Sequence, residues 1–314
     1  MSENDYNQEP PKELTTVADF IRWGASLFNR AGLHYGHGTD NAHDEAQWLV
    51  LHALSLESPL PEPLYSARLA EDERAAVMHL LQERVRTRRP AAYMIGEARF
   101  AGLKFHVNEY VLVPRSPVAE LIESGFEPWL EAHPVRRVAD LCTGSGCIAV
   151  ACALVFPEAR VWATDIDPHA LSVAEQNVAR YDLDQRVELR RGDLYADLPA
   201  DGGFELIVAN PPYVDAGAMA RLPDEYRHEP EVALAGGESG LDFAERIIRR
   251  AADYLSPEGL LVLEVGRGAS ALESRFPDLP MSWPEFERGG FGVCLIHAAD
   301  LGVLEAPEEG DRAG

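Results

Sequence analysis

Alternation of strand-like and helical runs is the feature of this sequence that most restricts its fold. From about Arg136 onward, short apolar runs of strand character are separated by stretches with helical periodicity. Such alternation is typical of a doubly wound α/β fold, in which helices connect parallel strands and cover both faces of one sheet. We expect strands at 137–141, 160–165, 186–193, 204–210 and 260–266, and helices near 146–155, 168–181, 239–255 and 268–275.

The end of the chain breaks this alternation. Two strand-like runs, near 281–287 and 291–298, are joined by Gly289-Gly290, which leaves no room for a crossover helix. Strands connected so closely are antiparallel, so the last strand should run against its neighbour. The sequence thus predicts seven strands in the α/β part.

The first part of the chain predicts helices instead. Apolar residues recur at helical spacing from Leu14 to about Arg89, and Pro90 ends the third expected helix. The alternating run around Gly102 predicts a β-hairpin. The expected organisation is a disordered N-terminus (1–12), a helical domain (13–91), a hairpin connector (92–115), an α/β domain (116–304) and a disordered tail (305–314).

Charge and cysteine content narrow the possible functions. The net charge is −24, which disfavours binding to a phosphate backbone and favours a basic protein partner, unless the charge serves solubility alone. No apolar run approaches the ~20 residues of a membrane span, and the first residues are polar, so we expect a cytoplasmic protein. The four cysteines match no zinc-binding spacing and should be reduced thiols.

A glycine-containing loop follows the first strand of the expected sheet. The strand leads into Asp-Leu-Cys-Thr-Gly-Ser-Gly (140–146) and then into a helix, and Gly144 and Gly146 allow a tight turn close to a ligand. Asp165, at the end of the second strand, lies 21 residues after Gly144, near the spacing at which a carboxylate binds a ribose diol. The pattern therefore predicts a nucleoside-binding site.

Asp140 distinguishes between two kinds of nucleoside cofactor. The loop also satisfies the dinucleotide pattern G-x-G-x-x-A, so its glycines alone do not exclude NAD. A carboxylate at position 140 repels a pyrophosphate but can pair with the cationic amino-acid end of S-adenosyl-L-methionine. Asp167 precedes Pro168 and suits a helix N-cap, whereas Asp193 is either close to an adenine amine or simply a surface carboxylate.

The fourth expected strand ends in Asn210-Pro211-Pro212-Tyr213, at the edge where ligands of such sheets bind. An amide nitrogen is a poor nucleophile because its lone pair is delocalised. The side-chain carbonyl of Asn210 and the backbone carbonyl of Pro211 can each accept one N–H of a flat NH2 group, and Tyr213 can stack on it. The prolines stiffen the loop, so positioning and electrostatics carry a methyl transfer without a general base.

A simple turn is the alternative interpretation of Asn-Pro. The motif is more specific than a turn, however, because it follows a strand and lies downstream of the D-x-x-T-G-S-G loop.

Together these motifs resemble the protein-glutamine methyltransferases of the HemK family. The resemblance covers the helical domain and the sequences VLVPR (111–115), DLCTGSG, ATDID, NPPY and LEVG. Within the family, the chain is most similar to the branch that methylates a glutamine of large-subunit ribosomal protein three, the PrmB branch. The marks of that branch are Arg22-Trp23, 34–45 and 114–122. The release-factor branch typically has PR-x-x-T-E, and GTGSG where this chain has Cys142.

The resemblance implies a Rossmann-like class I methyltransferase sheet of seven strands, with the helical domain and hairpin choosing a basic protein substrate. That substrate would be large-subunit ribosomal protein three, free or in an assembly intermediate, with no membrane and no sequence-specific nucleic acid involved. The implied contacts with S-adenosyl-L-methionine are Asp140, Cys142, Thr143, Gly144, Ser145, Gly146, Asp165, Asp193, Leu194 and Asn210. The implied contacts with the substrate are Asn210, Pro211, Pro212 and Tyr213, with Asn210, Pro211 and Tyr213 catalytic.

Three alternatives remain open at this point. A release-factor glutamine methyltransferase is the nearest, and a DNA or RNA adenine methyltransferase could use the same motif on a flipped base. A module that only senses S-adenosyl-L-methionine is disfavoured by the intact motif. For His34, His37 and His43 we expect no metal ion, and we expect Thr39 or Asp40 to cap the following helix.

Overall fold

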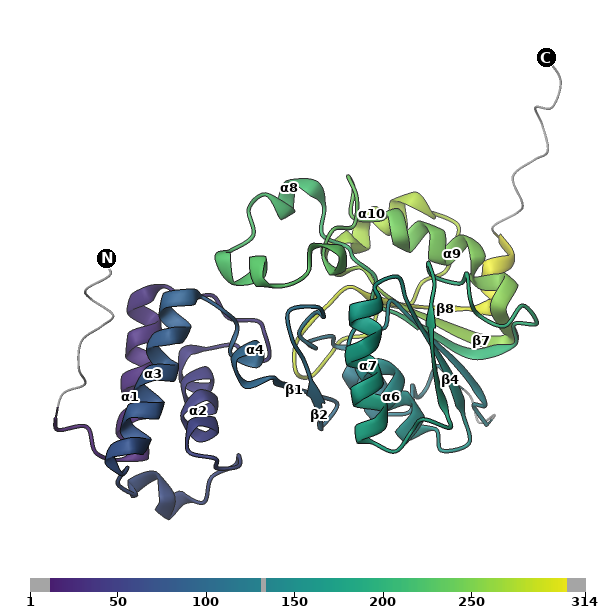
Figure 1. Ribbon diagram of the computed structural model, residues 1–314. Helices are drawn as coiled ribbons and strands as arrows, with labels where there is room; N and C mark the ends of the chain where they lie inside the picture. The colour runs from purple at the N-terminus through teal and green to yellow at the C-terminus, as the bar shows by residue number, and fades with distance from the viewer. Residues whose placement is uncertain (1–11, 131–133, 304–314) are drawn as a thin grey trace.

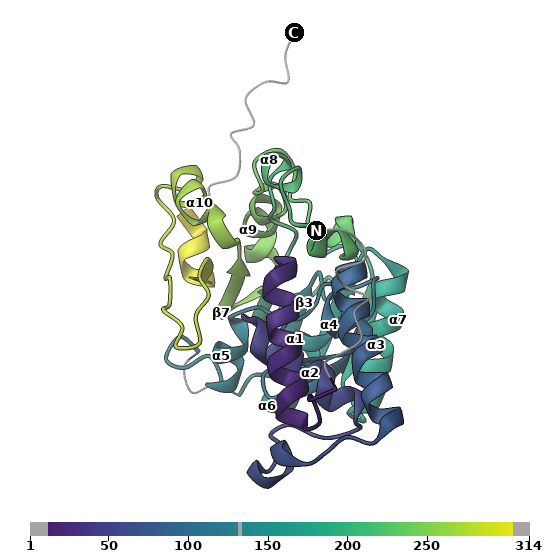
Figure 2. The same ribbon diagram turned by 90° about the vertical axis from the view of Figure 1, so that its left-hand side faces the viewer.

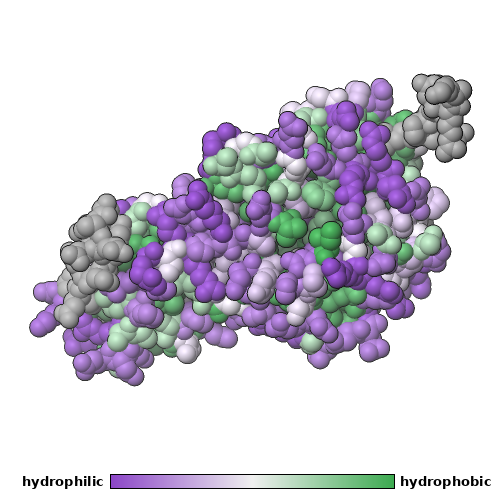
Figure 3. All heavy atoms as spheres, turned by 45° about the horizontal axis from the view of Figure 1, so that its top comes forward, coloured by the Kyte–Doolittle hydropathy of each residue, from purple (hydrophilic) through white to green (hydrophobic). Residues whose placement is uncertain are grey.

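The computed structural model describes residues 12–130 and 134–303, which form a helical part and an α/β part joined by a β-hairpin (Figure 1). The predicted disordered ends, 1–12 and 305–314, lie outside the described residues apart from Lys12. Within the described ranges, no helix combines the length and the apolar character that a membrane span requires. Most of the face seen in Figure 3 is hydrophilic, with small hydrophobic areas near its middle.

The helical part contains α1 (Val17–Ala31), α2 (Ala42–Ala53), the 3₁₀ turn η2 (Glu62–Ser66), α3 (Glu71–Thr87) and the short α4 (Ala91–Ile95). The start of α1 is fixed by a capping box, in which the side chains of Thr16 and Asp19 each accept from the other's backbone N–H. Helices α1, α2 and α3 lie side by side (Figure 2) and bury their apolar stripes in a shared core. The three predicted amphipathic helices are therefore confirmed.

The predicted hairpin is also present, as β1 (Glu97–Phe100) and β2 (Leu103–His106). It is tied to the α/β part by Asn177, a fully buried residue on α7 (Pro168–Arg180). The Asn177 amide accepts from the N–H of His106 at 2.7 Å and donates to the carbonyl oxygens of His106 and Ser145 at 2.9 and 2.8 Å. One side chain thus joins the connector to the glycine loop.

Within the described residues, one sheet of six strands has the order β5 (Val187–Arg191), β4 (Arg160–Asp165), β3 (Arg137–Leu141), β6 (Phe204–Ala209), β7 (Leu255–Glu264) and β8 (Val293–His297). The first five are parallel, and β8 is antiparallel to β7, so the last strand is reversed as predicted, but against β7 and not against 281–287. One face is covered by α5 (Val118–Glu123), α6 (Cys147–Val155) and α7, and the other by α9 (Asp242–Tyr254) and α10 (Ala269–Arg275). Burial on both faces is typical of a doubly wound sheet.

The predicted seventh strand, near 281–287, is wrong. In the described structure only Ser282 pairs from this run, through an isolated antiparallel bridge to Leu295. Pro284 has no N–H and therefore cannot extend the ladder. The run reaches the edge of the sheet at one residue and then leaves it.

The predicted cap of α2 is wrong as well. The cap is neither Thr39 nor Asp40 but Asn41, whose side chain accepts from the N–H of Asp44 at 3.0 Å. Because the helix begins at Ala42, only Asn41 stands at the position from which a side chain reaches the third helical N–H. Sequence patterns also gave no sign of α8 (Ala216–Met219) and the 3₁₀ turns η3 (Asp224–His228), η4 (Glu231–Ala233), η5 (Gly266–Gly268) and η6 (Ala298–Val303).

Replacing Asn177 by Ala should destabilise the protein by roughly 2–4 kcal/mol, because one buried and two part-buried backbone groups lose their partner. The matched control is Gln176→Ala, since Gln176 is exposed and its amide donates to Ser172 in the same helix. Urea unfolding should show a lower midpoint for Asn177→Ala and almost none of this shift for the control. Equal shifts for the two variants would contradict the role assigned to Asn177.

Candidate active site

A cavity lies at the carboxyl ends of β3, β4 and β6, where the chain order of the sheet reverses. Ligands of open α/β sheets bind at this position. Tyr110, Ile166 and Val232 contribute apolar side chains that are about half exposed. The predicted site residues that line this first cavity are Cys142, Thr143, Gly144, Ser145, Asp165, Asp193, Leu194, Asn210 and Pro212.

The glycine loop takes a shape that needs small residues. Gly144 and Gly146 have φ values of +54° and +77°, in the left-handed region that glycine adopts without strain. A Cβ atom on Gly146 would lie 3.1 Å from Cβ of Ala174, so this glycine brings α6 close to α7. At Gly144 a Cβ would meet no atom within 4 Å, so this glycine leaves open space in the wall of the cavity.

Asp140 is buried beneath the loop, and its contact with a cofactor stays a prediction. Its carboxylate accepts from the hydroxyl of Thr143 at 2.5 Å and from the N–H of Ala149 at 3.1 Å, and it is not among the residues that line the cavity. These two donors hold the carboxylate beneath the loop. Burial raises the pKa of Asp140 to about 7. Its primary role in this geometry is to fix the loop to the start of α6.

Asp165 and Asp193 face the cavity with different partners. Asp165 accepts from the backbone N–H groups of Gly144 and Asp167, both at 2.9 Å, and burial raises its pKa. Each of its oxygens keeps lone-pair capacity for a ligand hydroxyl. Asp193 is paired with Arg246 at 2.5 Å, and about half of its side chain is exposed. Asp167 caps α7 and is followed by Pro168, as predicted.

The Asn210-Pro211-Pro212-Tyr213 corner divides the first cavity from a second one. Asn210 lines both cavities, while Pro211 and Tyr213 line only the second, together with Leu222 and Tyr226. Within the described residues, neither the side chain of Asn210 nor the carbonyl oxygen of Pro211 has a hydrogen-bond partner. Two polar groups of one rigid corner are therefore available to a ligand.

Tyr213 is held by a buried acid. Its hydroxyl donates to Oε1 of Glu264 at 2.9 Å, and the hydroxyl of Ser116 donates to Oε2 at 2.5 Å. Burial raises the pKa of both Tyr213 and Glu264. The ring lies against Gly266, where a Cβ would come within 2.7 Å of a ring carbon. The orientation of the ring is thus set from both its hydroxyl and its edge.

Arg115 and Glu229 form a second buried contact beside the corner. The guanidinium pairs with the carboxylate through two bonds, of 2.5 and 2.9 Å, and the N–H of Val113 also donates to Glu229. Burial alone raises the pKa of Glu229, but Arg115 and His37 outweigh it and lower the pKa to about 2. The pair joins the strand-like segment 111–115 to the segment after the corner.

Comparison with known proteins identifies the family. Residues 126–222 match the methyltransferase small domain. The ribosomal protein uL3 glutamine methyltransferase of Bordetella pertussis (strain Tohama I) is 49% identical over 291 residues, which cover 92% of this chain and 97% of that protein. The enzyme of the same name from Burkholderia pseudomallei (strain K96243) is 47% identical, covering 93% and 97%. The chain belongs to this family.

Membership confirms the family and the branch that the motifs predicted. The fold is also shared with the catalytic domain of hMettl16, solved in complex with MAT2A 3'UTR hairpin 1, with a TM-score of 0.50. That protein is 15% identical, and the match covers 95% of this chain and 93% of that one. The expected class I methyltransferase fold is therefore confirmed, with six strands in the described residues in place of seven.

Sequence reasoning placed the cavity but missed several residues that hold it. Ser116 and Glu264 lie in motifs that carried the resemblance, and an acid at the end of the apolar run LLVLE was the available signal for Glu264. Glu229 lies at the end of a charged run between Pro223 and Pro230, which by itself indicates only a loop. Among the described residues, no group of three or more His, Cys, Asp or Glu side chains is arranged to hold a metal ion.

Asp140 predicts a pH dependence of stability. Its pKa rises from 3.8 to about 7 on folding, so the folded state binds a proton that the unfolded state releases between these values. The stabilisation that protonated Asp140 contributes is therefore fully present below about pH 4, and it is lost as the pH rises through 7. Thermal unfolding from pH 5 to 8 should show the wild type losing stability relative to Asp140→Asn.

The matched control is Asp201→Asn. The pKa of this exposed carboxylate is lowered by its hydrogen bond with Arg137, so the sign of its contribution is reversed and the effect is small. Parallel pH profiles for the wild type and Asp140→Asn would show that Asp140 is not the group responsible.

Proposed function

We propose that this protein transfers a methyl group from S-adenosyl-L-methionine to the side-chain amide nitrogen of a glutamine in ribosomal protein uL3. The observation that carries the proposal is the pair of unpartnered groups at the corner, the side chain of Asn210 and the carbonyl of Pro211. They lie where two adjoining cavities meet. The similarity to uL3 glutamine methyltransferases supports this substrate over a release factor.

The first cavity fits the cofactor by its donor set. Asp165 offers carboxylate oxygens to ribose hydroxyls, and Ile166 and Leu194 offer apolar surface to a purine. The open space at Gly144 lets the cofactor approach the backbone closely. Beneath the loop, Oδ1 of Asp140 is buried with no hydrogen-bond partner in the described residues, so this oxygen can accept from a donor group of the cofactor. When bound, S-adenosyl-L-methionine supplies a methyl group activated by its sulfonium.

The second cavity would hold the glutamine side chain. The carbonyl oxygens of Asn210 and Pro211 accept the two N–H groups of the substrate amide, which orients its nitrogen toward the first cavity. Pro212 keeps this corner rigid. Tyr213, fixed by Glu264, covers the flat amide and excludes water. No general base is required before transfer, because orientation and hydrogen bonding align the nitrogen with the methyl group. As the N–C bond forms, the S–C bond breaks and leaves S-adenosyl-L-homocysteine, and the methylated nitrogen, now strongly acidic, then loses one proton.

We propose that each part of the chain has its own role. The helical part, 13–91, and the connector, 92–115, recognise the protein substrate, and 116–304 carries out the reaction. A net charge of −24 attracts a basic ribosomal protein and repels nucleic acid, which disfavours the adenine methyltransferase alternative. The reaction takes place in the cytoplasm, on uL3 that is free or part of an assembly intermediate.

Replacing Asn210 by Ala should lower the rate of uL3 methylation by about 100-fold or more, the cost typical of losing one positioned polar contact in a reaction. Label from methyl-labelled S-adenosyl-L-methionine is counted in uL3, a release factor and DNA, each offered separately. The control is Asn29→Ala, on the exposed side of α1. Label in DNA or release factor alone, or an unchanged rate for Asn210→Ala, would overturn the proposal.

Replacing Tyr213 by Phe keeps the ring but removes its hydrogen bond to Glu264, so single-turnover methylation should slow by about tenfold. Tyr213→Ala also removes the ring and should cost about tenfold more. The control is Tyr254→Phe, because Tyr254 stacks on Tyr195 and does not belong to the corner. If Tyr213→Phe and Tyr213→Ala were equally slow, the ring would have no role of its own.

A further inference from the structure

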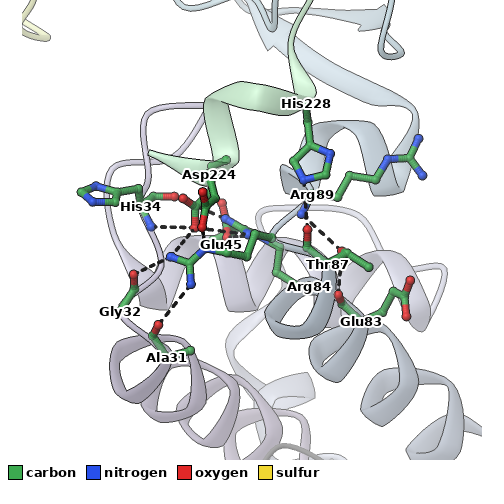
Figure 4. A network of polar contacts seen from close by, with 12 residues as sticks. Ala31, Gly32, His34, Glu45, Glu83, Arg84, Thr87, Arg89, Asp224 and His228 are labelled. Atoms are coloured by element: carbon green, nitrogen blue, oxygen red, sulfur yellow. Dashed lines mark hydrogen bonds and ion pairs between the residues drawn. The ribbon is translucent and has the colours of Figure 1, made fainter. Parts of the chain in front are cut away.

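A buried cluster of charged side chains joins the helical part to the segment after the corner. We call it the junction cluster, and its members are Glu45 on α2, Arg84 and Arg88 at the end of α3, and Glu225 in η3. Glu45, Arg84 and Glu225 are each 0% exposed. Figure 4 shows Glu45 and Arg84 beside the segment that carries Asp224 and His228.

Glu225 takes its contacts within the described residues from the helical part. Its Oε1 accepts from the N–H of His34 at 3.0 Å and lies 2.9 Å from Nη2 of Arg88 and 3.9 Å from Nη1 of Arg84. Arg84 is held in turn by Glu45 at 2.8 Å and donates to the carbonyl oxygen of His34 at 3.3 Å. The acidic side chain that η3 contributes is therefore surrounded by residues between positions 34 and 88.

Stability alone is a poor explanation for such a cluster. Removing charges from water costs free energy that their attraction only partly returns, so apolar residues of similar volume are often as stabilising. Charged groups differ from apolar ones because each requires a defined partner at a defined distance. The junction cluster thus fixes where η3 lies relative to α2 and α3.

The position of η3 is transmitted to the corner by the backbone that follows it. The N–H of Val214 donates to Leu234 at 2.8 Å, and the N–H of Gly236 donates to Val214 at 2.9 Å. A Cβ on Gly236 would lie 2.6 Å from Cα of Tyr213, so the two backbones are in direct contact. Between η3 and Gly236, Val232 lines the first cavity, and Leu234 lines the second.

We propose that Glu225 and Arg84 are positioning residues, through which the helical part holds residues 224–236 against the Asn210–Tyr213 corner. Neither residue lines the cavities, and both act through Val214 and Gly236. The inference rests on the proposed function only for the identity of the substrate, because the mechanical link is independent of it. It gives the helical part a role in the reaction step in addition to substrate recognition.

The informative variant is Glu225→Gln. The glutamine keeps an oxygen for the N–H of His34, and its NH2 takes the place of Oε2, which is buried without a partner in the described residues. The variant therefore removes the charge and leaves the shape. Arg84→Met removes the opposite charge, and the double variant removes both. Asp224→Asn, a 61% exposed neighbour whose contacts to Arg88 and Arg227 are 3.7–3.9 Å long, is the matched control.

The first readout is amide hydrogen exchange at Val214 and Gly236, which needs no substrate. Glu225→Gln and Arg84→Met should each speed exchange at these two amides at least tenfold, while Asp224→Asn leaves it unchanged. The double variant should exchange at least as fast as either single variant, since Glu45 then loses Arg84 and Arg88 loses Glu225. Unchanged exchange at both amides in both single variants would overturn the proposal.

The second readout is methylation of uL3 well below the unfolding temperature of each variant. Glu225→Gln should lower kcat at least fivefold and change the Kd for S-adenosyl-L-methionine less than twofold. A merely structural role would lower the melting temperature and leave kcat per folded molecule unchanged, which would count against the proposal. A wild type that labels another substrate but not uL3 would refute the proposed function alone, and the variants would then be compared on that substrate.

Discussion

The loop between β6 and α9 is closed by three backbone hydrogen bonds, which join Val214 to Leu234 and to Gly236, and Ala216 to Gly237. They bring the end of the loop back against its beginning, so that the corner at 210–213 and the turn η4 both line the second cavity. Without this closure, Asn210 would follow β6 but the second cavity would lack its far side. The geometry of the site therefore depends on a close backbone contact at position 236. Only glycine permits it, since a Cβ there would collide with Tyr213.

Three anchors then fix this closed loop to the rest of the protein. Glu264 ties Tyr213 to the end of β7, Arg115 ties Glu229 to the connector, and the helical part ties down Glu225. Each anchor is a buried acid with a donor from another part of the chain. The chain thus places some of its arginines inside, opposite buried acids, and its net charge of −24 suits the basic protein partner that we propose.

Local patterns were sufficient to predict the sheet, the glycine loop and the corner. These features depend on neighbouring residues, such as Gly144 and Gly146 in a tight turn or two prolines after a strand. The wrong seventh strand has a physical reason too, because Pro284 prevents strand pairing in a run that is apolar enough for a strand. The anchor at Glu225 could not be predicted, because His34 and Glu225 lie 191 positions apart and no local pattern encodes such a pairing.

Two carbonyl oxygens at a rigid corner recognise any flat NH2 group, whether it belongs to a glutamine or to a base. Selection between such groups must therefore come from what surrounds the corner. Here the surroundings are Leu222 and Tyr226, carried by the segment that Glu225 fixes to the helical part. A fold that delivers the same corner can change its substrate by changing this segment and its anchor, while the strand end that presents Asn210 stays as it is.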